Sequence, residues 1–160
     1  MKKHLFLLIF ILFLTISLYP AHIAHAKENV FSEIIHNTDG SYITIETVVN
    51  NPILDITNTR SSYSKTVSKT FTYYENDNEA AWDVVLTATF IYDNISSQCI
   101  SSSATYHVYD SYWSCTSLLP GKAGNAAWAN FTFVKKILFI TYNTYTGSVS
   151  ISCSADGTIS

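Results

Sequence analysis

The stretch WDVVLTATFIY, residues 82–92, decides the fold. Apolar side chains occupy every second position of this stretch, and polar residues such as Asp83, Thr87 and Thr89 stand between them. A period of two residues is typical of a β-strand that buries one face and exposes the other. The inward positions are Trp82, Val84, Leu86, Ala88, Phe90 and Tyr92. We therefore predict one long strand here, with half of its side chains in a core.

The same alternation returns along the chain. It is found in SYITIETVV (41–49), ATYHVYD (104–110), WANFTFV (128–134) and YTGSVSISC (145–153). Between such segments lie residues that favour turns, as in ENDNE at 75–79. No long apolar pattern has the 3.6-residue period of a helix. The pattern predicts an all-β protein, an antiparallel β-sandwich of immunoglobulin-like or jelly-roll-like type, with about seven to nine strands.

One predicted strand is less regular. In YSKTVSKTFTYY (63–74), the apolar Val67 and Phe71 share a face with Lys65 and Lys69. Lysine side chains on an exposed sheet edge hinder pairing with other chains. We therefore predict that this segment is an edge strand.

Residues 1–26 have the pattern of a secretory signal peptide. They begin with MKK, continue with an apolar run and end in Ala24-His25-Ala26, a small-x-small cleavage signature. The apolar run is shorter than the ~20 residues of a membrane-spanning helix. We expect cleavage, a secreted extracellular product and no stable membrane insertion afterwards. Residues 27–60 are then an N-terminal extension or the first strands, and residues 61–160 form the β-sandwich domain.

Charge and motifs exclude several classes of function. The net charge of −3 becomes −5 once Lys2 and Lys3 are removed, and the other lysines are scattered. This distribution excludes a nucleic-acid partner and a polybasic lipid anchor. Neither Cys-x-x-Cys nor His-Glu-x-x-His is present, and ENDNE lacks the glycine and terminal glutamate of an EF-hand loop. We expect no metal and no cofactor, and we interpret ENDNE as a solvated hairpin tip.

Several motifs carry a resemblance. They are SKTVSKTFTYY, the alternating strand from Trp82, a single cysteine, YHVYDSYWS, GNAA and the closing CSADGTIS. Across residues 64–160 the chain resembles an uncharacterised group of small secreted all-β proteins of Gram-positive anaerobes, which has no assigned activity. The resemblance implies a secreted all-β domain with one cysteine in mid-chain and one near the C-terminus, at Cys99 and Cys153. Cys115 is an addition to that pattern.

The three cysteines allow one bridge and one remaining thiol. We expect the bridge between Cys99 and Cys153, because Cys153 is in phase with the inward face of the last strand. Such a loop of about 55 residues contributes about 4 kcal/mol in the chain-entropy model. The pairs Cys99–Cys115 and Cys115–Cys153, or no internal bridge, remain alternatives. Cys115, in phase with Trp113 and Leu119, is expected to be a packed free thiol; an intermolecular bridge and a reactive nucleophile are the alternatives.

Catalytic residues are hard to find in this sequence. His107 lies on the outward face of its strand, and Asp110 and Ser111 follow it, so a Ser–His–Asp grouping can be drawn. No Gly-x-Ser-x-Gly motif accompanies it. The carboxylates of Glu46, Asp83 and others are glycosidase candidates by residue type alone. We expect a solvated strand histidine, and a small hydrolase with its site near His107 and Asp110 is the alternative.

The chain has an unusually high content of aromatic residues, with 11 Tyr, 9 Phe and 3 Trp. We expect Tyr74, Tyr109, Tyr112 and Tyr142 to be outward-facing aromatics for binding a sugar ring or a protein. The sequence therefore favours a secreted, non-enzymatic extracellular binding module for a glycan, a cell wall or a protein. A hydrolase is the second hypothesis, and a self-associating surface protein or toxin-like protein is the third.

Overall fold

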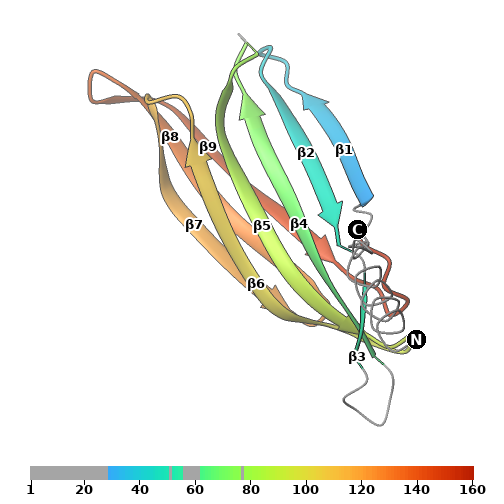
Figure 1. Cartoon of the computed structure of the whole chain (residues 1–160). Coiled ribbons are helices and arrows are strands. Elements are labelled where there is room, and N and C mark those ends of the chain that lie inside the picture. The colour runs from blue at the N-terminus through green and yellow to red at the C-terminus, as the bar shows by residue number, and fades with distance from the viewer. Residues whose placement is uncertain (1–28, 51, 56–61, 77) are drawn as a thin grey trace, which may run out of the picture.

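The computed structural model describes residues 29–50, 52–55, 62–76 and 78–160. The predicted signal peptide, residues 1–26, lies outside these residues. Within them the chain forms nine strands and no helix, arranged as two antiparallel sheets that face one another (Figure 1). The all-β sandwich predicted from the alternating pattern is confirmed.

The larger sheet has the order β1-β2-β4-β5-β6, with β3 also paired to β4, and the smaller sheet has the order β7-β8-β9. Neighbouring strands mostly follow one another along the chain, so each sheet is a meander, whereas immunoglobulin-like and jelly-roll-like sandwiches use Greek-key connections. The bounds are β1 (Asn29–His36), β2 (Tyr42–Val49), β3 (Ile53–Asp55), β4 (Ser62–Tyr74), β5 (Ala80–Tyr92), β6 (Ser97–Val108), β7 (Trp113–Ala123), β8 (Ala126–Ile137) and β9 (Ile140–Ser152).

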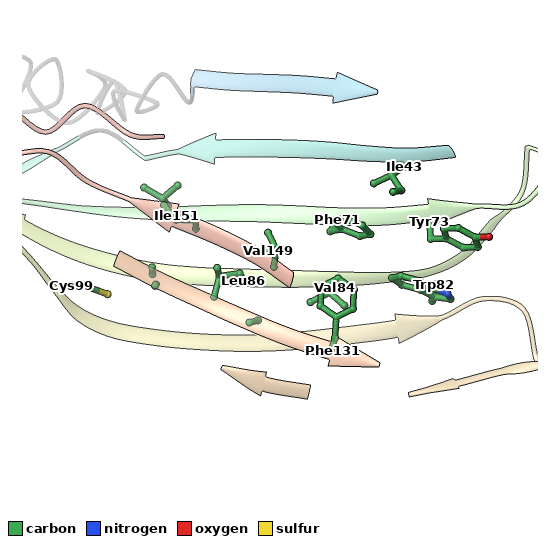
Figure 2. Packing of buried hydrophobic residues seen from close by; sticks show 14 of the residues in the cluster. Ile43, Phe71, Tyr73, Trp82, Val84, Leu86, Cys99, Phe131, Val149 and Ile151 are labelled. Atoms are coloured by element: carbon green, nitrogen blue, oxygen red, sulfur yellow. The ribbon is translucent and has the colours of Figure 1, made fainter. Parts of the chain in front are cut away.

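The core lies between the two sheets and is rich in aromatic rings (Figure 2). All six predicted inward residues of β5 are buried, which confirms the period-two interpretation. Trp82 stacks on Phe133 of the opposite sheet with ring centroids 4.0 Å apart, and Phe71 contacts Phe131 at 5.2 Å. Each fully buried large side chain contributes roughly 1.5–3 kcal/mol of transfer free energy. These rings therefore hold the two sheets together.

The prediction that residues 63–74 form an edge strand is wrong. This segment is β4, and it lies between β2 and β5 inside the larger sheet. Its inward lysines bind backbone carbonyls instead of guarding an edge: Lys65 Nζ donates to Gly157 O at 2.5 Å, and Lys69 Nζ donates to Ser150 O at 2.8 Å. A lysine stem can cover apolar surface while its ammonium group reaches a polar partner. Burial lowers the pKa of Lys69.

The two ends of the sandwich differ in their connections. At one end, here called the loop end, lie the connections 37–41, 109–112 and 138–139 and the described residues 75, 76, 78 and 79 of the β4–β5 connection. At the other, the closed end, lie the turns 93–96 and 124–125 and the C-terminal residues 153–160. β2 contributes Ile43 and Val49 to the core between the sheets, whereas β1 is exposed along its whole length. Phe31 of β1 instead borders a small hollow together with Ile159 and Ser160.

Candidate ligand-binding site at the loop end

A partly buried ion pair joins the two sheets at the loop end. Glu75 follows β4, and Lys135 lies on β8 in phase with the buried Phe131 and Phe133. Lys135 Nζ lies 2.7 and 2.6 Å from the two carboxylate oxygens of Glu75, and Trp113 Nε1 donates to Glu75 Oε1 at 3.0 Å. The pair fixes the β4–β5 hairpin against the smaller sheet.

Lys135 also approaches a second carboxylate, because its Nζ lies 3.6 Å from Asp110 Oδ2. Burial by itself would lower the pKa of Lys135, but the hydrogen bond and charge of Glu75 and the charge of Asp110 raise it above its ordinary value. Lys135 is therefore a firmly protonated cation, held between carboxylates at the loop end.

Two clefts flank this ion pair, and Glu75 and Lys135 line both. The first cleft has a volume of about 510 Å³ and the second a volume of about 440 Å³. The first is lined by Glu75, Glu79, Ala80, Ala81, Tyr109, Asp110, Ser111, Tyr112 and Lys135. The second is lined by Asp39, Ser41, Tyr73, Glu75, Asn76, Lys135, Tyr142 and Asn143. Both volumes are in the range of small-molecule sites, but the linings are more polar than usual.

Three of the four predicted binding aromatics gather at these clefts. Tyr109 and Tyr112 are 59% and 58% exposed and border the first cleft; Tyr142 is 74% exposed and borders the second. Tyr74 lines neither cleft. It is partly buried and stacks on Tyr42 with ring centroids 4.5 Å apart. The structure thus places Tyr109 and Tyr112 at the first cleft and Tyr142 at the second, and it leaves Tyr74 in a pair between strands.

Asp83 on β5 organises the outer face beside the first cleft. Asp83 is buried. Its Oδ1 accepts a hydrogen bond from the His107 backbone N–H at 3.2 Å, and its Oδ2 accepts one from the Tyr109 hydroxyl at 2.5 Å. The His107 ring nitrogen Nδ1 lies 3.2 Å from the same Oδ1. The hydrogen bond to Asp83 raises the pKa of Tyr109. Asp83 therefore fixes the orientation of Tyr109 at the rim of the cleft.

His107 and Asp110, the residues of the hydrolase hypothesis, have different partners. His107 is exposed, as its outward position predicted, and its carboxylate partner is Asp83. Asp110 Oδ1 accepts the backbone N–H of Tyr112 at 2.9 Å, which closes the turn before β7. In the described part of the chain, no serine or cysteine side chain is hydrogen-bonded to His107. The structure therefore provides no activated nucleophile beside this histidine.

The three cysteines carry free thiols, and two of them lie at the closed end. Cys99 and Cys153 are both buried. The N–H of Cys99 donates to Gly124 O at 2.8 Å, and the N–H of Cys153 donates to Asn125 O at 3.0 Å. The two cysteines therefore flank one two-residue turn. Burial raises the pKa of the Cys99 thiol, which keeps it protonated in the reduced form.

Cys115 lies near the loop end, on β7 opposite Phe133. A bulge after Cys115 shifts the alternation of β7, so Leu119 is exposed although Trp113 is buried. Burial raises the pKa of the partly buried Cys115 thiol. Because a strand rises about 3.3 Å per residue, Cys115 lies roughly 20 Å or more from the closed end. A disulfide needs Cα atoms within about 7 Å of each other. An internal bridge from Cys115 to either other cysteine would need a rearranged fold.

Sequence reasoning missed Glu75, Lys135 and the role of Asp83. The sequence predicts Glu75 as part of a solvated tip, whereas in the structure it binds Lys135 and Trp113. The available signal was that Lys135 continues the inward phase of Phe131 and Phe133. The pairing of Asp83 with His107 depends on the register between β5 and β6, which no pattern within a single strand reveals.

Comparison of the chain with protein-family models, with curated proteins and with solved structures finds no match. Within the described residues, no group of three or more histidine, cysteine, aspartate or glutamate side chains is arranged to hold a metal ion. The same part of the chain contains no helix with the length and apolar character needed to span a bilayer. The case for a function therefore rests on the geometry of the loop end.

Proposed function

We propose that this protein is a secreted, non-enzymatic module that binds a glycan at the loop end. The observation that carries the proposal is the placement of Tyr109, Tyr112 and Tyr142 around two polar clefts joined by Glu75 and Lys135. Exposed tyrosine rings offer apolar faces to sugar rings and a hydroxyl at their edge. A concave site with a few fixed polar groups orients such a ligand.

The lining also indicates which glycans fit. Ser111, Asn76 and Asn143 supply hydroxyl and amide groups that donate to and accept from sugar hydroxyls. Four carboxylates line the two clefts, those of Asp39, Glu75, Glu79 and Asp110, and Lys135 is the one lysine among the lining residues. Like charges repel an acidic ligand. We therefore expect a neutral or amino-substituted glycan rather than a uronic-acid or phosphate-rich polymer.

The carboxylates support binding rather than hydrolysis. A glycosidase needs two carboxylates that are free to act on either side of the scissile bond. Glu75 is engaged by Lys135 and Trp113, and Asp83 accepts three hydrogen-bond contacts from His107 and Tyr109. The hydrolase alternative keeps one test: if His107→Ala abolishes activity on any substrate of a generic panel, the non-enzymatic proposal is wrong.

Secretion and a disulfide belong to the same proposal. The signal-peptide pattern of residues 1–26 supports export, and exported chains meet an oxidising environment. The position of Cys99 and Cys153 around one turn supports their pairing there. A peptide map of the secreted protein, alkylated without reductant, should contain a Cys99–Cys153 linked peptide and label Cys115 only after unfolding. Native labelling of Cys115, or a link through it, would contradict this assignment.

The decisive experiment is calorimetric titration with a panel of neutral, amino-substituted and acidic oligosaccharides. We expect binding within the first two classes, weakened roughly tenfold or more by Tyr112→Ala or Tyr142→Ala through loss of ring stacking. Phe31→Ala is the matched control, because Phe31 is an exposed aromatic residue on β1 that lines neither cleft. Binding that survives both tyrosine substitutions, or no binding by any member of the panel, would overturn the proposal.

A further inference from the structure

The turn between β8 and β9 exposes four consecutive apolar side chains, residues 137–140, here called the apolar tip. Ile137 is 41% exposed, Leu138 85%, Phe139 99% and Ile140 71%. In Figure 1 this hairpin projects at the loop end, at the upper left of the view. A contiguous group of exposed large apolar side chains often marks a surface that binds something else.

The backbone of the apolar tip adds a second, independent sign. Leu138 and Phe139 both have positive φ, 50° and 68°. A two-residue hairpin turn of this kind favours Asn-Gly, because side chains with a bulky Cβ are strained in the left-handed region. Leucine and phenylalanine therefore oppose the turn and gain no burial from it. Strain that the fold does not use is a reason to seek a function for these side chains.

We propose that the apolar tip inserts into the interfacial region of a zwitterionic lipid bilayer and docks the module reversibly on a membrane surface. Ile137 and Ile140 face each other across the hairpin, and Leu138 and Phe139 form its end. The apolar surface therefore covers the end of the hairpin and extends onto both strands. A groove on a protein would cover one side of this convex tip, whereas lipid surrounds all of it.

The residues behind the tip suit the boundary between acyl chains and headgroups. Tyr142 and Tyr112 are exposed, and the backbone N–H of Lys136 donates to Tyr112 O at 2.9 Å, which places Tyr112 beside the base of the hairpin. Lys136 is itself exposed. Tyrosine is enriched at headgroup depth, and lysine extends its ammonium group to the lipid surface.

The charge of the loop end decides the kind of lipid. Lys135 is neutralised by Glu75, and the carboxylates of Asp39 and Asp110 face the same end as Lys136. This arrangement gives no attraction to an anionic surface, so burial of the apolar tip has to supply the affinity. Four apolar residues anchor a protein reversibly and shallowly, which agrees with the absence of stable insertion expected from the sequence.

The first test replaces Phe139 by tryptophan and measures quenching by phosphatidylcholine vesicles with brominated acyl chains. We expect the fluorescence of Phe139→Trp to shift to the blue and to be quenched on binding. Ile95→Trp is the matched control, because Ile95 is exposed at the closed end. Equal quenching of both variants, or none of Phe139→Trp, would overturn the proposal.

The second test uses Leu138→Asn with Phe139→Gly, which supplies the residues that the turn favours and so protects folding. We expect the partition coefficient of this double variant for phosphatidylcholine vesicles to be lower by roughly tenfold or more. Leu119→Asn, an exposed leucine of β7, should bind as the wild type does. Unchanged binding by the double variant refutes the tip as the anchor. A second result would also refute it: the wild type sediments as a dimer and does not bind vesicles, and the double variant is a monomer. In that case the tip would join two copies of the chain.

The membrane inference and the proposed glycan site can fail separately. The glycan titrations contain no lipid, and the vesicles contain no sugar. Vesicle binding without any oligosaccharide binding would sustain the tip and overturn the glycan proposal. Oligosaccharide binding without vesicle binding would sustain the glycan proposal and overturn the membrane inference.

Discussion

The loop end and the closed end terminate the same strands, but they differ in what covers the strand ends. At the closed end, Gly124 and Asn125 accept backbone hydrogen bonds from the two cysteines, and Ala155 O accepts from Asn94 at 2.8 Å. Connections at the loop end also make backbone hydrogen bonds, such as Tyr109 N–H to Ala81 O at 2.9 Å, but there they border two clefts and one of them carries the apolar tip. The loop end is therefore distinguished by its clefts and its exposed apolar tip, because backbone groups are paired at both ends.

The difference also concerns where left-handed backbone is placed. At the closed end it falls on Gly124, Gly157 and Asn94, residue types that adopt positive φ readily. At the loop end it falls on Gly40 and Asn78, and also on Leu138 and Phe139. Among the described residues, large apolar side chains therefore occupy the left-handed region at the apolar tip alone.

The largest effect on stability should come from removing the proposed Cys99–Cys153 disulfide from the oxidised protein. Replacing either cysteine by alanine should lower the free energy of unfolding by up to about 4 kcal/mol, since the closed loop is lost from the unfolded chain. Cys115→Ala should cost only about 1 kcal/mol, as a truncation in a half-buried site. Urea unfolding with and without reductant measures both. A reductant-insensitive wild type would refute the bridge.

Gly157→Ala should be next in size. Gly157 has φ of +85°, and an added Cβ would lie 2.5 Å from Tyr92 Cζ, inside the packed closed end. Overlap and backbone strain together should cost about 3 kcal/mol. Gly124→Ala is the control: its φ is +54° but no atom lies within 4 Å of the added Cβ, so about 1 kcal/mol is expected. Equal losses of melting temperature would show that the closed end is not tightly packed.

Lys135→Met should have an intermediate effect at the loop end. It leaves Glu75 without its cation and should cost about 2 kcal/mol, less than the roughly 3–5 kcal/mol of a fully buried pair because Glu75 is partly exposed. The folded-state pKa of Lys135 lies above its ordinary value of 10.5, so its contribution is complete below that pH and is lost as the pH rises through the folded-state pKa.

The pH dependence gives this prediction a sharper form. The stability difference between wild type and Lys135→Met, measured by urea unfolding, should be constant near neutrality and should shrink in alkaline solution above about pH 10.5. A difference that grows with alkalinity would show that the ion pair does not stabilise the fold.

The smallest effect should have the opposite sign. Leu138→Asn with Phe139→Gly should raise the free energy of unfolding by about 1 kcal/mol, because Asn-Gly suits the turn. Thermal unfolding in the absence of lipid measures this gain. A loss of stability would mean that the apolar side chains support the fold, and the contrast between the two ends would weaken.

The sequence predicted the strands well where a single period controls burial, as in β5 and β8. It failed where inward polar groups find partners from remote segments. Lys65 and Lys69 suggested an edge strand, yet their ammonium groups bind carbonyls of Gly157 and Ser150. A pattern within one strand cannot show that such acceptors lie opposite.

The candidate site was predictable only in part. Outward phase selected Tyr109 and Tyr142 correctly, but it could not reveal that both lie at one end, which depends on strand order. The bulge after Cys115 likewise shifted Leu119 to the surface. The sequence does not predict the apolar tip, because KKILFITY (135–142) has the composition of a continuous strand. The backbone turn at Leu138 and Phe139 is what exposes these apolar side chains.

The meander has a consequence for the order of folding. Because most strands pair with their predecessor, the loops closed at each step are short, and local contacts of this kind speed folding. The two sheets can thus assemble as separate hairpin arrays, and their docking is expected to be the late step. Trp82 stacks on Phe133 across that junction, so its fluorescence would report the docking event directly in a stopped-flow refolding experiment.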